Sequence, residues 1–375
     1  MIDWIFPRHA LAEQILDGMS KNLLDRVSVF APRKRGKTEF IQHDIIPMAV
    51  ERGILPVYVD FWLFEDDPAA CFSYGVDKAI TAHATFVERV KDSGRSLTAF
   101  ELITLWGKAR AERKRAEDNT AKAFERLEAI DMPILLLLDE VQHLSSDPKF
   151  IGFTKTLRSF MTSRRDSKIK GIFTGSSRSG LQRLFKETKA PFFDAAQSVK
   201  FEELGDDFVR YQLSNFEKAT GGLTLEFEKI NDYFLQEGRK PARLTEILKR
   251  MVHVRLSDFD MALELYRDDI LEDDLSGQQK SLIALKALDF AILYLVAIGQ
   301  KGRFYSPDTI EKMKTLELIP QQSKVSQGTV SNSIKRLKET NLLYNPSHGQ
   351  YELESPELRD SIIELMPERV AVNRR

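Results

Sequence analysis

Residues 31–38 read Ala-Pro-Arg-Lys-Arg-Gly-Lys-Thr. This stretch matches the phosphate-loop pattern G-x-x-x-x-G-K-[S/T], except that Ala31 stands where the first glycine is usual. The apolar run 27–30 precedes it, and a helical pattern begins at Lys37. We therefore expect the stretch to join a buried strand to the N-terminus of a helix, which is the setting that a phosphate-binding loop requires.

The loop has the residue types that hold a nucleoside triphosphate. Gly36 permits close approach of the backbone, Lys37 reaches the β- and γ-phosphates, and the Thr38 hydroxyl coordinates Mg²⁺. Ala31 restricts the backbone where glycine would not. The alternative is a chance basic loop before a surface helix. The expected nucleotide-contacting residues are Ala31, Pro32, Arg33, Lys34, Arg35, Gly36, Lys37, Thr38 and Glu39.

A second motif supports the same chemistry. Residues 134–140 read Ile-Leu-Leu-Leu-Leu-Asp-Glu, an apolar strand that runs into two carboxylates. Ligands of open α/β sheets bind at the carboxyl ends of the strands. We expect Asp139 to hold Mg²⁺ through water and Glu140 to polarise the attacking water. The alternative is a strand that merely ends at a solvated turn, and the presence of the loop at 31–38 argues against it.

A third segment, Gly-Ile-Phe-Thr-Gly-Ser-Ser-Arg at 171–178, again takes a strand into a polar turn. A polar side chain at this position is suited to lie between the γ-phosphate and the attacking water. We expect Ser176 to fill this role, with Thr174 as the second candidate. For either residue the alternative is an ordinary transition from strand to loop.

The apolar pattern predicts an α/β fold with a mostly parallel sheet. The expected strands are near-continuous apolar runs that alternate with helical stretches, as in sheets covered by helices on both faces. They lie at 27–30, 57–61, 134–138, 170–174 and 199–201, and an opening helix is expected at 11–24.

A strongly charged helical stretch spans about 68–130. We interpret its basic cluster as a solvated helix face, and a second phosphate-contacting surface is the alternative. The cluster consists of Lys108, Arg110, Arg113, Lys114 and Arg115.

The order of these motifs resembles that of AAA+ ATPases, and more narrowly the archaeal-ATPase and STAND branch and the origin-recognition-type initiators. That branch often shows G-P-R-R-x-G-K-T, a box with Phe and Arg before the first helix (here Phe6-Pro7-Arg8) and a Val-Tyr-Val-Asp strand (here 57–60). Asp-Glu-Val-Gln-His-Leu at 139–144 is similar to bacterial transposition-helper ATPases, and 191–204 resembles the segment after the sensor turn.

The resemblance covers about residues 1–250 and implies ATP and Mg²⁺ as cofactors. The sequence departs from the family at Ala31 and at Ser176, which stands in place of the usual sensor asparagine. Both departures bear on the hydrolysis rate more than on nucleotide binding.

The resemblance also implies a helical lid that supplies a sensor residue to the nucleotide. Gly-Arg-Lys-Pro-Ala-Arg at 238–243 matches this loosely, with Arg243 as the sensor and Pro241 near the adenine. An exposed basic helix start is the alternative. The resemblance further implies an arginine finger from a neighbouring subunit, for which Arg178 and Arg183 are both candidates.

The C-terminal part resembles a winged helix-turn-helix. An apolar helix is expected at 280–300, and Pro307 opens another helix. In the segment 325–338, apolar residues at i, i+4 and i+7 (Val330, Ile334 and Leu337) predict a third helix with one buried face. The runs 342–344 and 350–353, joined by Asn-Pro-Ser-His-Gly, predict a hairpin.

The outer face of the third helix carries short polar side chains and cations that suit contacts with DNA phosphates and base edges. A winged helix used for protein contacts or as a structural cap is the alternative. The expected DNA-contacting residues are Ser326, Thr329, Asn332, Ser333 and Arg336, with Lys335 on the same face.

We divide the chain into a nucleotide-binding α/β core at 1–204, a helical lid at 205–275 and a winged helix-turn-helix domain at 276–375. A length of 375 residues suits two or three domains. The composition, with 42% hydrophobic and 30% charged residues, excludes a disordered or collagen-like chain. The formal net charge of −1 neither requires nor excludes a nucleic-acid partner.

The sequence predicts a cytoplasmic protein. Its single cysteine, Cys71, excludes an intramolecular disulfide and favours a reducing compartment. Asp3 interrupts the apolar start of the chain, which lacks the features of an export signal. Charged residues within 281–298 argue against a membrane span. The cysteine and the histidines show no ligand spacing for structural zinc.

Together these features predict an ATPase that hydrolyses ATP to ADP and phosphate as a conformational or assembly switch coupled to DNA binding. The expected partners are double-stranded DNA and further copies of the chain or a partner protein, without a membrane. The first alternative is a STAND-like signalling or defence ATPase that oligomerises and binds protein. Further alternatives are a nucleotide binder that scarcely hydrolyses ATP and a P-loop small-molecule kinase, which would need neither the Asp-Glu pair nor a winged helix.

Overall fold

The structure is a computed structural model. It describes residues 2–93, 101, 104–105, 120–162, 168–185, 190, 192, 194–266, 281–347, 349–354 and 357–373. The basic cluster at 108–115 lies outside these residues. The chain forms two compact units, 1–246 and 247–375, which are described separately below. The expected three-part division at 204 and 275 stays a prediction.

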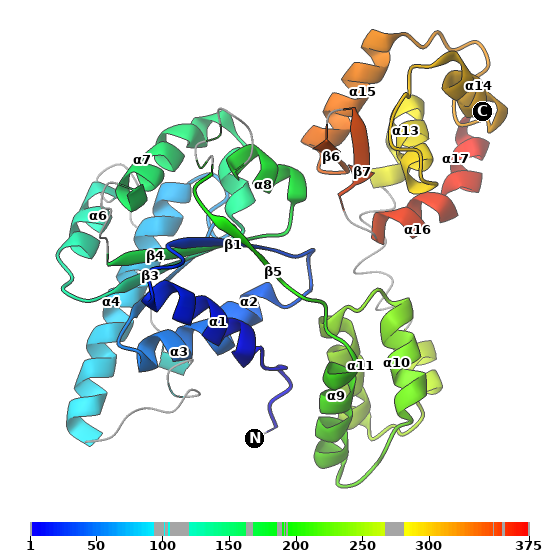
Figure 1. Ribbon diagram of the computed structural model, residues 1–375. Coiled ribbons are helices and arrows are strands. Elements are labelled where there is room, and N and C mark those ends of the chain that lie inside the picture. Colours follow the sequence, from blue (N-terminus) through cyan, green and yellow to red (C-terminus); the bar gives the residue numbers. More distant parts are fainter. Residues whose placement is uncertain are drawn as a thin grey trace. The chain divides into compact units, whose positions relative to one another are not determined.

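A parallel sheet of five strands forms the centre of the first unit (Figure 1). Each of the expected strands is confirmed, with ends that differ by a few residues. The strands are β1 (Arg26–Phe30), β2 (Leu55–Asp60), β3 (Ile134–Asp139), β4 (Ile169–Gly175) and β5 (Gln197–Lys200), in the order β2-β3-β4-β1-β5. All residues of β3 are buried, as expected of a strand with neighbours on both sides and helices above and below.

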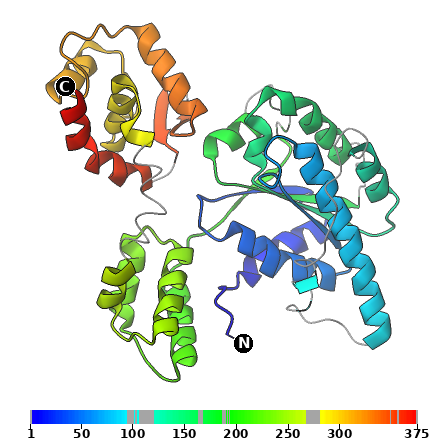
Figure 2. The same ribbon diagram turned by 180° about the vertical axis from the view of Figure 1, so that it is seen from behind.

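Helices cover both faces of this sheet, with α1 and α3 on one face and α7 and α8 on the other (Figures 1 and 2). Gly75 lets the long helix α4 approach β2 closely, because a Cβ at this position would lie 2.6 Å from the Tyr58 carbonyl oxygen. The helices are α1 (His9–Ser20), α2 (Lys37–Glu39), α3 (Ile46–Glu51), α4 (Pro68–Ser93), α6 (Thr120–Glu128), α7 (Ile151–Thr162) and α8 (Arg178–Phe185).

A π-helical segment, Phe40–Ile45, joins α2 to α3, so that helical structure runs on from Lys37 as expected. Pro47 lies just beyond this segment and has no N–H to donate, a common cause of such irregular helical turns. Two short 3₁₀ segments, Val141–Ser145 (η3) and Pro148–Phe150 (η4), follow β3.

The register of the sheet brings the polar strand ends together. Asp60 pairs with Asp139 across β2 and β3, and Phe30 pairs with Gly175 across β1 and β4. The carboxyl ends of these four strands therefore lie at one edge of the sheet, the edge at which α/β proteins bind ligands.

The first unit continues into α9 (Asp206–Thr220), α10 (Phe227–Gln236) and the start of α11 (Pro241–Val254), so the expected helices of this region are present. The segment before α1 links them to the sheet. The Phe6 ring makes edge-to-face contacts with Phe208 and Tyr211 of α9. The guanidinium carbon of Arg8 lies 3.9 Å from the ring centroid of Phe201, just after β5.

The second unit has its own apolar core, which includes Phe290, Leu295 and Leu337. The expected helix at 280–300 is interrupted at 284–286, and Lys286 has an extended backbone before α13. Two helices after the hairpin were not expected: the first contributes Leu358 and Ile362 to the core, and Met366 of the second packs against it. The elements are α13 (Ala287–Ala297), α14 (Pro307–Thr315), α15 (Gln327–Glu339), β6 (Leu343–Ser347), β7 (Gln350–Leu353), α16 (Glu357–Glu364) and α17 (Met366–Asn373).

The order of helices and hairpin in this unit is the order expected from the sequence, and the antiparallel pairing of β6 with β7 confirms the hairpin. Within the described residues, no helix combines the length and the apolar character needed to cross a bilayer.

Candidate functional site

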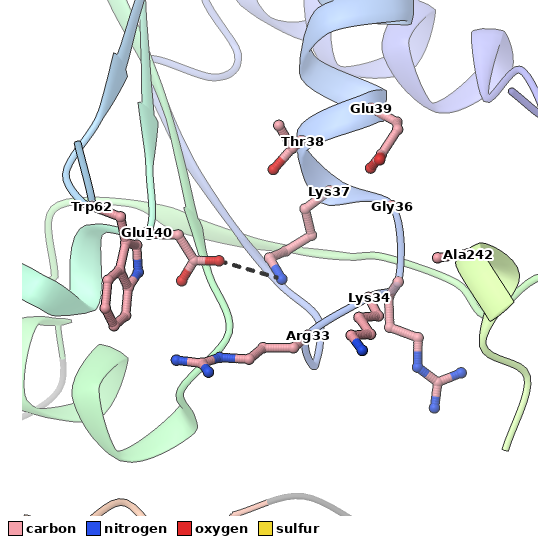
Figure 3. A pocket seen from close by; sticks show the side chains of 10 residues that line it. Arg33, Lys34, Gly36, Lys37, Thr38, Glu39, Trp62, Glu140 and Ala242 are labelled. Carbon is pink, nitrogen blue, oxygen red and sulfur yellow. Dashed lines mark ion pairs between the residues drawn. The ribbon is translucent and has the colours of Figure 1, made fainter. Parts of the chain in front are cut away.

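The loop between β1 and α2 forms one wall of a cavity of about 520 Å³. Figure 3 shows Lys37 and Glu140 facing each other across this cavity, with Trp62 beside Glu140. The cavity is lined by Arg33, Lys34, Arg35, Gly36, Lys37, Thr38, Glu39, Trp62, Glu140 and Ala242. The expected phosphate loop and the second expected carboxylate therefore meet at one site.

The backbone of the loop explains both its glycine and its alanine. Gly36 has a φ of 85°, a left-handed conformation that strains residues with a Cβ, and it directly precedes the first turn of α2. Ala31 is not among the residues with positive φ, and it is buried at the end of β1. The departure from the glycine pattern at this position therefore needs no unusual backbone conformation.

Lys37 is 5% exposed, and its ammonium group sits inside the loop. Its Nζ donates to the carbonyl oxygens of Ala31 at 2.8 Å and Pro32 at 3.1 Å, and lies 3.8 Å from Oε1 of Glu140. Burial lowers the pKa of Lys37, and the negative charges of Glu140 and Asp139 oppose this shift. The loop carbonyls thus hold the ammonium group beside the N-terminus of α2, where it can donate hydrogen bonds to phosphate oxygens.

Asp139 accepts hydrogen bonds from hydroxyl groups on three different elements. Thr38 Oγ1 and Tyr58 Oη each donate to Oδ2 at 2.9 Å, and Thr174 Oγ1 donates to Oδ1. The carboxylate is 2% exposed. Burial, and next the charge of Asp139, raises the pKa of the Tyr58 hydroxyl, which keeps it a donor.

Thr38 and Asp139 fit a magnesium ion in the type of their donor atoms. Mg²⁺ prefers hard oxygen ligands and keeps several waters, and a hydroxyl and a carboxylate supply such ligands next to the phosphate loop. Burial raises the pKa of the nearby Asp60 carboxyl, and Asp139 and Glu140 add to this shift. The site thus concentrates negative charge that a divalent cation would neutralise.

Glu140 follows β3 in a left-handed conformation with a φ of 54°. Its Oε2 accepts a hydrogen bond from Ser176 Oγ at 2.7 Å and another from Gln142 Nε2. The structure therefore brings Ser176 to Glu140, and its expected place between the γ-phosphate and the attacking water stays a prediction. Thr174, the second candidate, is fully buried and binds Asp139 instead.

Of the other residues expected at the nucleotide, Arg35 lines the cavity, whereas Pro241 and Arg243 do not. Arg35 is 7% exposed, and its Nη1 donates to the carbonyl oxygen of Arg239 at 2.8 Å, which links the loop to the turn before α11. Pro241 and Arg243 do not line the cavity, although Ala242 between them does. The Nη1 atom of Arg243 instead lies 2.5 Å from Oε2 of Glu237.

The structure leaves the arginine-finger alternatives open. Arg183 lies on α8 with a partly buried side chain, and Arg178 begins this helix with a side chain outside the described part of the structure. The choice between them stays a prediction.

Three residues at the site were not assigned a role from the sequence: Tyr58, Trp62 and Gln142. Trp62 is 41% exposed, and its ring centroid lies 5.4 Å from the guanidinium carbon of Arg33. The sequence carries a signal for Trp62, because it is an aromatic residue directly after the expected strand 57–61, which ends at the ligand-binding edge of the sheet. The signal for Gln142 is weaker: it is an uncharged polar residue two positions after Glu140.

The burial of residues on α15 in the second unit differs in part from the expected DNA-contacting face. Ser333 is fully buried, because the buried stripe of this helix runs through Val330, Ser333 and Leu337. Ser326 and Thr329 are exposed but bind each other in a capping box at the helix start. Asn332 and Lys335 are exposed, as expected.

Arg336 is bound by a carboxylate of its own unit. Its Nε and Nη2 donate to the two carboxylate oxygens of Asp289 on α13, at 3.1 Å and 2.6 Å, and Nη2 also donates to Ser333 Oγ. Asp289 is 3% exposed, whereas the Arg336 side chain is 39% exposed. The guanidinium therefore has a structural partner that the sequence did not predict, and its expected contact with DNA stays a prediction.

Replacing Arg336 with alanine is expected to lower the free energy of unfolding of the second unit by about 2–3 kcal/mol, because the buried Asp289 loses its charged donors. Chemical denaturation measures this change. Lys335→Ala, on an exposed site of the same helix, is the matched control and is expected to change stability by less than about 0.5 kcal/mol. Equal effects of the two variants would show that the pair does not stabilise the unit.

No family model matches this sequence, and neither does any curated protein. Among solved structures, a Walker-type ATPase of Pyrococcus abyssi is similar, with a TM-score of 0.61 and 15% identity over 96% of each chain. The ADP form of the ORC2 protein of Aeropyrum pernix has a TM-score of 0.54 and 17% identity, covering 97% of this chain and 93% of that chain. The chain thus has the α/β fold of AAA+ P-loop NTPases.

Proposed function

We propose that this protein binds ATP with Mg²⁺ in the cavity between the loop at 31–38 and Glu140, and hydrolyses it to ADP and phosphate. One observation carries the proposal: Lys37, Thr38, Asp139, Glu140 and Ser176 come from three separate segments, yet their polar groups converge at one edge of the sheet. Phosphoryl transfer to water requires a cation for the phosphates, ligands for Mg²⁺ and a base for the water, and these groups supply all three.

Each group has a role that follows from its position. The backbone N–H groups at the start of α2 and the Lys37 ammonium bind the phosphate oxygens. Thr38 and Asp139 would hold Mg²⁺, which would neutralise charge on the phosphates. Glu140 accepts the proton of the attacking water, and Ser176 orients the carboxylate by donating to Oε2.

The loop also contacts the helical part of the first unit through Arg35, so a change in the loop can reach these helices. Nη1 of Arg35 donates to the Arg239 carbonyl, and Nη2 of Arg35 lies 3.6 Å from Oε1 of Glu203. The other carboxylate oxygen of Glu203, Oε2, lies 3.7 Å from Nε of Arg239. A shift of the loop on phosphate binding changes these contacts directly. We infer that ATP binding and hydrolysis switch the arrangement of α9, α10 and α11 through Arg35.

The second unit is proposed to bind double-stranded DNA through α15 as a winged helix. Exposed Asn332 and Lys335 support this assignment, while Ser333 and Arg336 are now given a structural role in the unit. Short amides read base edges and lysines bind phosphates.

Duplex DNA is expected to raise the steady-state rate of ATP hydrolysis. Lys335→Glu is expected to weaken DNA binding about tenfold and to reduce the stimulation, with the basal rate unchanged. Fluorescence anisotropy of labelled duplex and phosphate release measure the two effects, with Lys218→Glu on α9 as the matched charge reversal. A basal rate indifferent to DNA, together with no DNA binding, would favour the STAND-like alternative, a signalling ATPase that binds protein.

A further inference from the structure

The side chain of Gln142 is bound at both ends of its amide. Its Nε2 donates to Oε2 of Glu140 and, at 3.2 Å, to Oγ of Ser176. Its Oε1 accepts a hydrogen bond from the Ser176 backbone N–H at 3.3 Å. The backbone N–H requires an acceptor and the carboxylate requires a donor, so the two ends of the amide are not interchangeable.

Two glycines form the space that this side chain occupies. A Cβ at Gly175, the last residue of β4, would lie 2.6 Å from Oε1 of Gln142. A Cβ at Gly180 on α8 would lie 2.4 Å from Cβ of Gln142. Any larger residue at either position would displace Gln142, so the sequence keeps a notch at the junction of β4, η3 and α8.

The backbone of Gln142 is tied to the same junction. Ser145 Oγ donates to the carbonyl oxygen of Gln142 at 2.8 Å and to that of Gly180 at 3.2 Å. Gln142 is 9% exposed, so water competes little for its amide. The position of the amide is therefore set by η3 and α8 together and not by Glu140 alone.

This arrangement fixes one oxygen of Glu140 and leaves the other on the cavity side. Oε2 has donors from Gln142 and Ser176, whereas Oε1 lies 3.8 Å from the Lys37 ammonium. Glu140 has a left-handed backbone with a φ of 54°, and its side chain lies between Lys37 and the amide of Gln142.

We propose that Gln142 is the positioning residue of Glu140: it holds Oε2 from the notch between Gly175 and Gly180 and so presents Oε1 to the attacking water. The proposal rests on the proposed ATP hydrolysis and adds a residue to it. Gln142 contacts no substrate atom, and its effect passes through Glu140. A carboxylate that is held in one orientation avoids the loss of rate that follows from a displacement of about 1 Å.

Two replacements of similar size keep the notch filled and change only the amide. Gln142→Met removes both hydrogen-bonding ends and is expected to lower kcat about 10- to 100-fold while KM changes less than about twofold. Gln142→Glu replaces the amide donor by a second carboxylate against Oε2 and is expected to lower kcat by a similar factor, because the two carboxylates repel each other.

The experiment measures phosphate release from ATP with Mg²⁺ over a range of ATP concentrations, which separates kcat from KM. Gln14→Met on the exposed face of α1 is the matched control and is expected to behave as the wild type. An unchanged kcat in both Gln142→Met and Gln142→Glu would overturn the positioning role. A rise of KM at constant kcat would overturn it as well, because that result assigns Gln142 to nucleotide binding or to folding.

The two proposals fail in different ways. If the wild type releases no phosphate, the proposed hydrolysis is wrong and the role of Gln142 falls with it. If the wild type and both Gln142 variants release phosphate with the same kcat and the same KM, only the role of Gln142 is wrong.

Discussion

Replacing Glu140 with glutamine is expected to lower the rate of ATP hydrolysis by about 10²- to 10⁴-fold while the affinity for ATP stays within a few-fold of the wild type. Glutamine keeps the size of the side chain and a carbonyl oxygen, but it cannot accept the proton of the attacking water. The carboxylate lies opposite Lys37 and receives donors from Ser176 and Gln142, so its loss removes the base without opening the cavity.

Phosphate release and the binding of a fluorescent ATP analogue separate the two effects. Glu125→Gln, an exposed carboxylate on α6, is the matched control. A variant that hydrolyses ATP at the wild-type rate would remove Glu140 from the reaction. A variant that no longer binds the analogue would assign Glu140 to nucleotide binding instead.

Replacing Lys37 with methionine is expected to weaken ATP binding by about 3 kcal/mol, roughly a hundredfold. The ammonium is buried in the loop and bound by the Ala31 and Pro32 carbonyls, so it reaches the phosphates without first being ordered. Methionine fills similar space but leaves the phosphate charge without its closest cation.

Isothermal titration with ATP and Mg²⁺ measures this loss, and circular dichroism checks that the variant is folded. Lys122→Met on an exposed position of α6 serves as the control and is expected to bind ATP normally. Equal affinities of Lys37→Met and the wild type would place the triphosphate away from the loop.

The strands were predictable because each is a continuous apolar run, and a parallel sheet covered on both faces needs such runs. The position of the site followed from the same fact. Once 134–138 is a strand, Asp139 and Glu140 must lie at the edge where the phosphate loop also lies. The glycine pattern was less informative, since Ala31 takes no positive φ and so needs no glycine.

The contacts that the sequence did not predict are those between side chains far apart in the chain. Helical periodicity put Arg336 on an outer face, but Asp289 is 47 residues away and binds it. Ser333 is small enough to lie in the buried stripe of α15 despite its hydroxyl. Arg243 was expected at the nucleotide, yet Glu237, just before its helix, provides a closer partner.

The position of Gln142 at the candidate site could not be predicted from the sequence either. Its position depends on the absence of side chains at Gly175 and Gly180, which lie on a strand and a helix that follow it in the chain. The packing of η3 against both β4 and α8 brings these three residues together. No local pattern in 139–144 carries this information.

The most direct measurement is phosphate release from ATP by the wild-type protein in the presence of Mg²⁺, followed by chelation of the metal and its restoration. The account predicts steady turnover that stops when Mg²⁺ is removed and returns when Mg²⁺ is added in excess, because Thr38 and Asp139 supply oxygen ligands beside the phosphate loop. An absence of turnover in protein that binds ATP, or turnover that is indifferent to the metal, would contradict it.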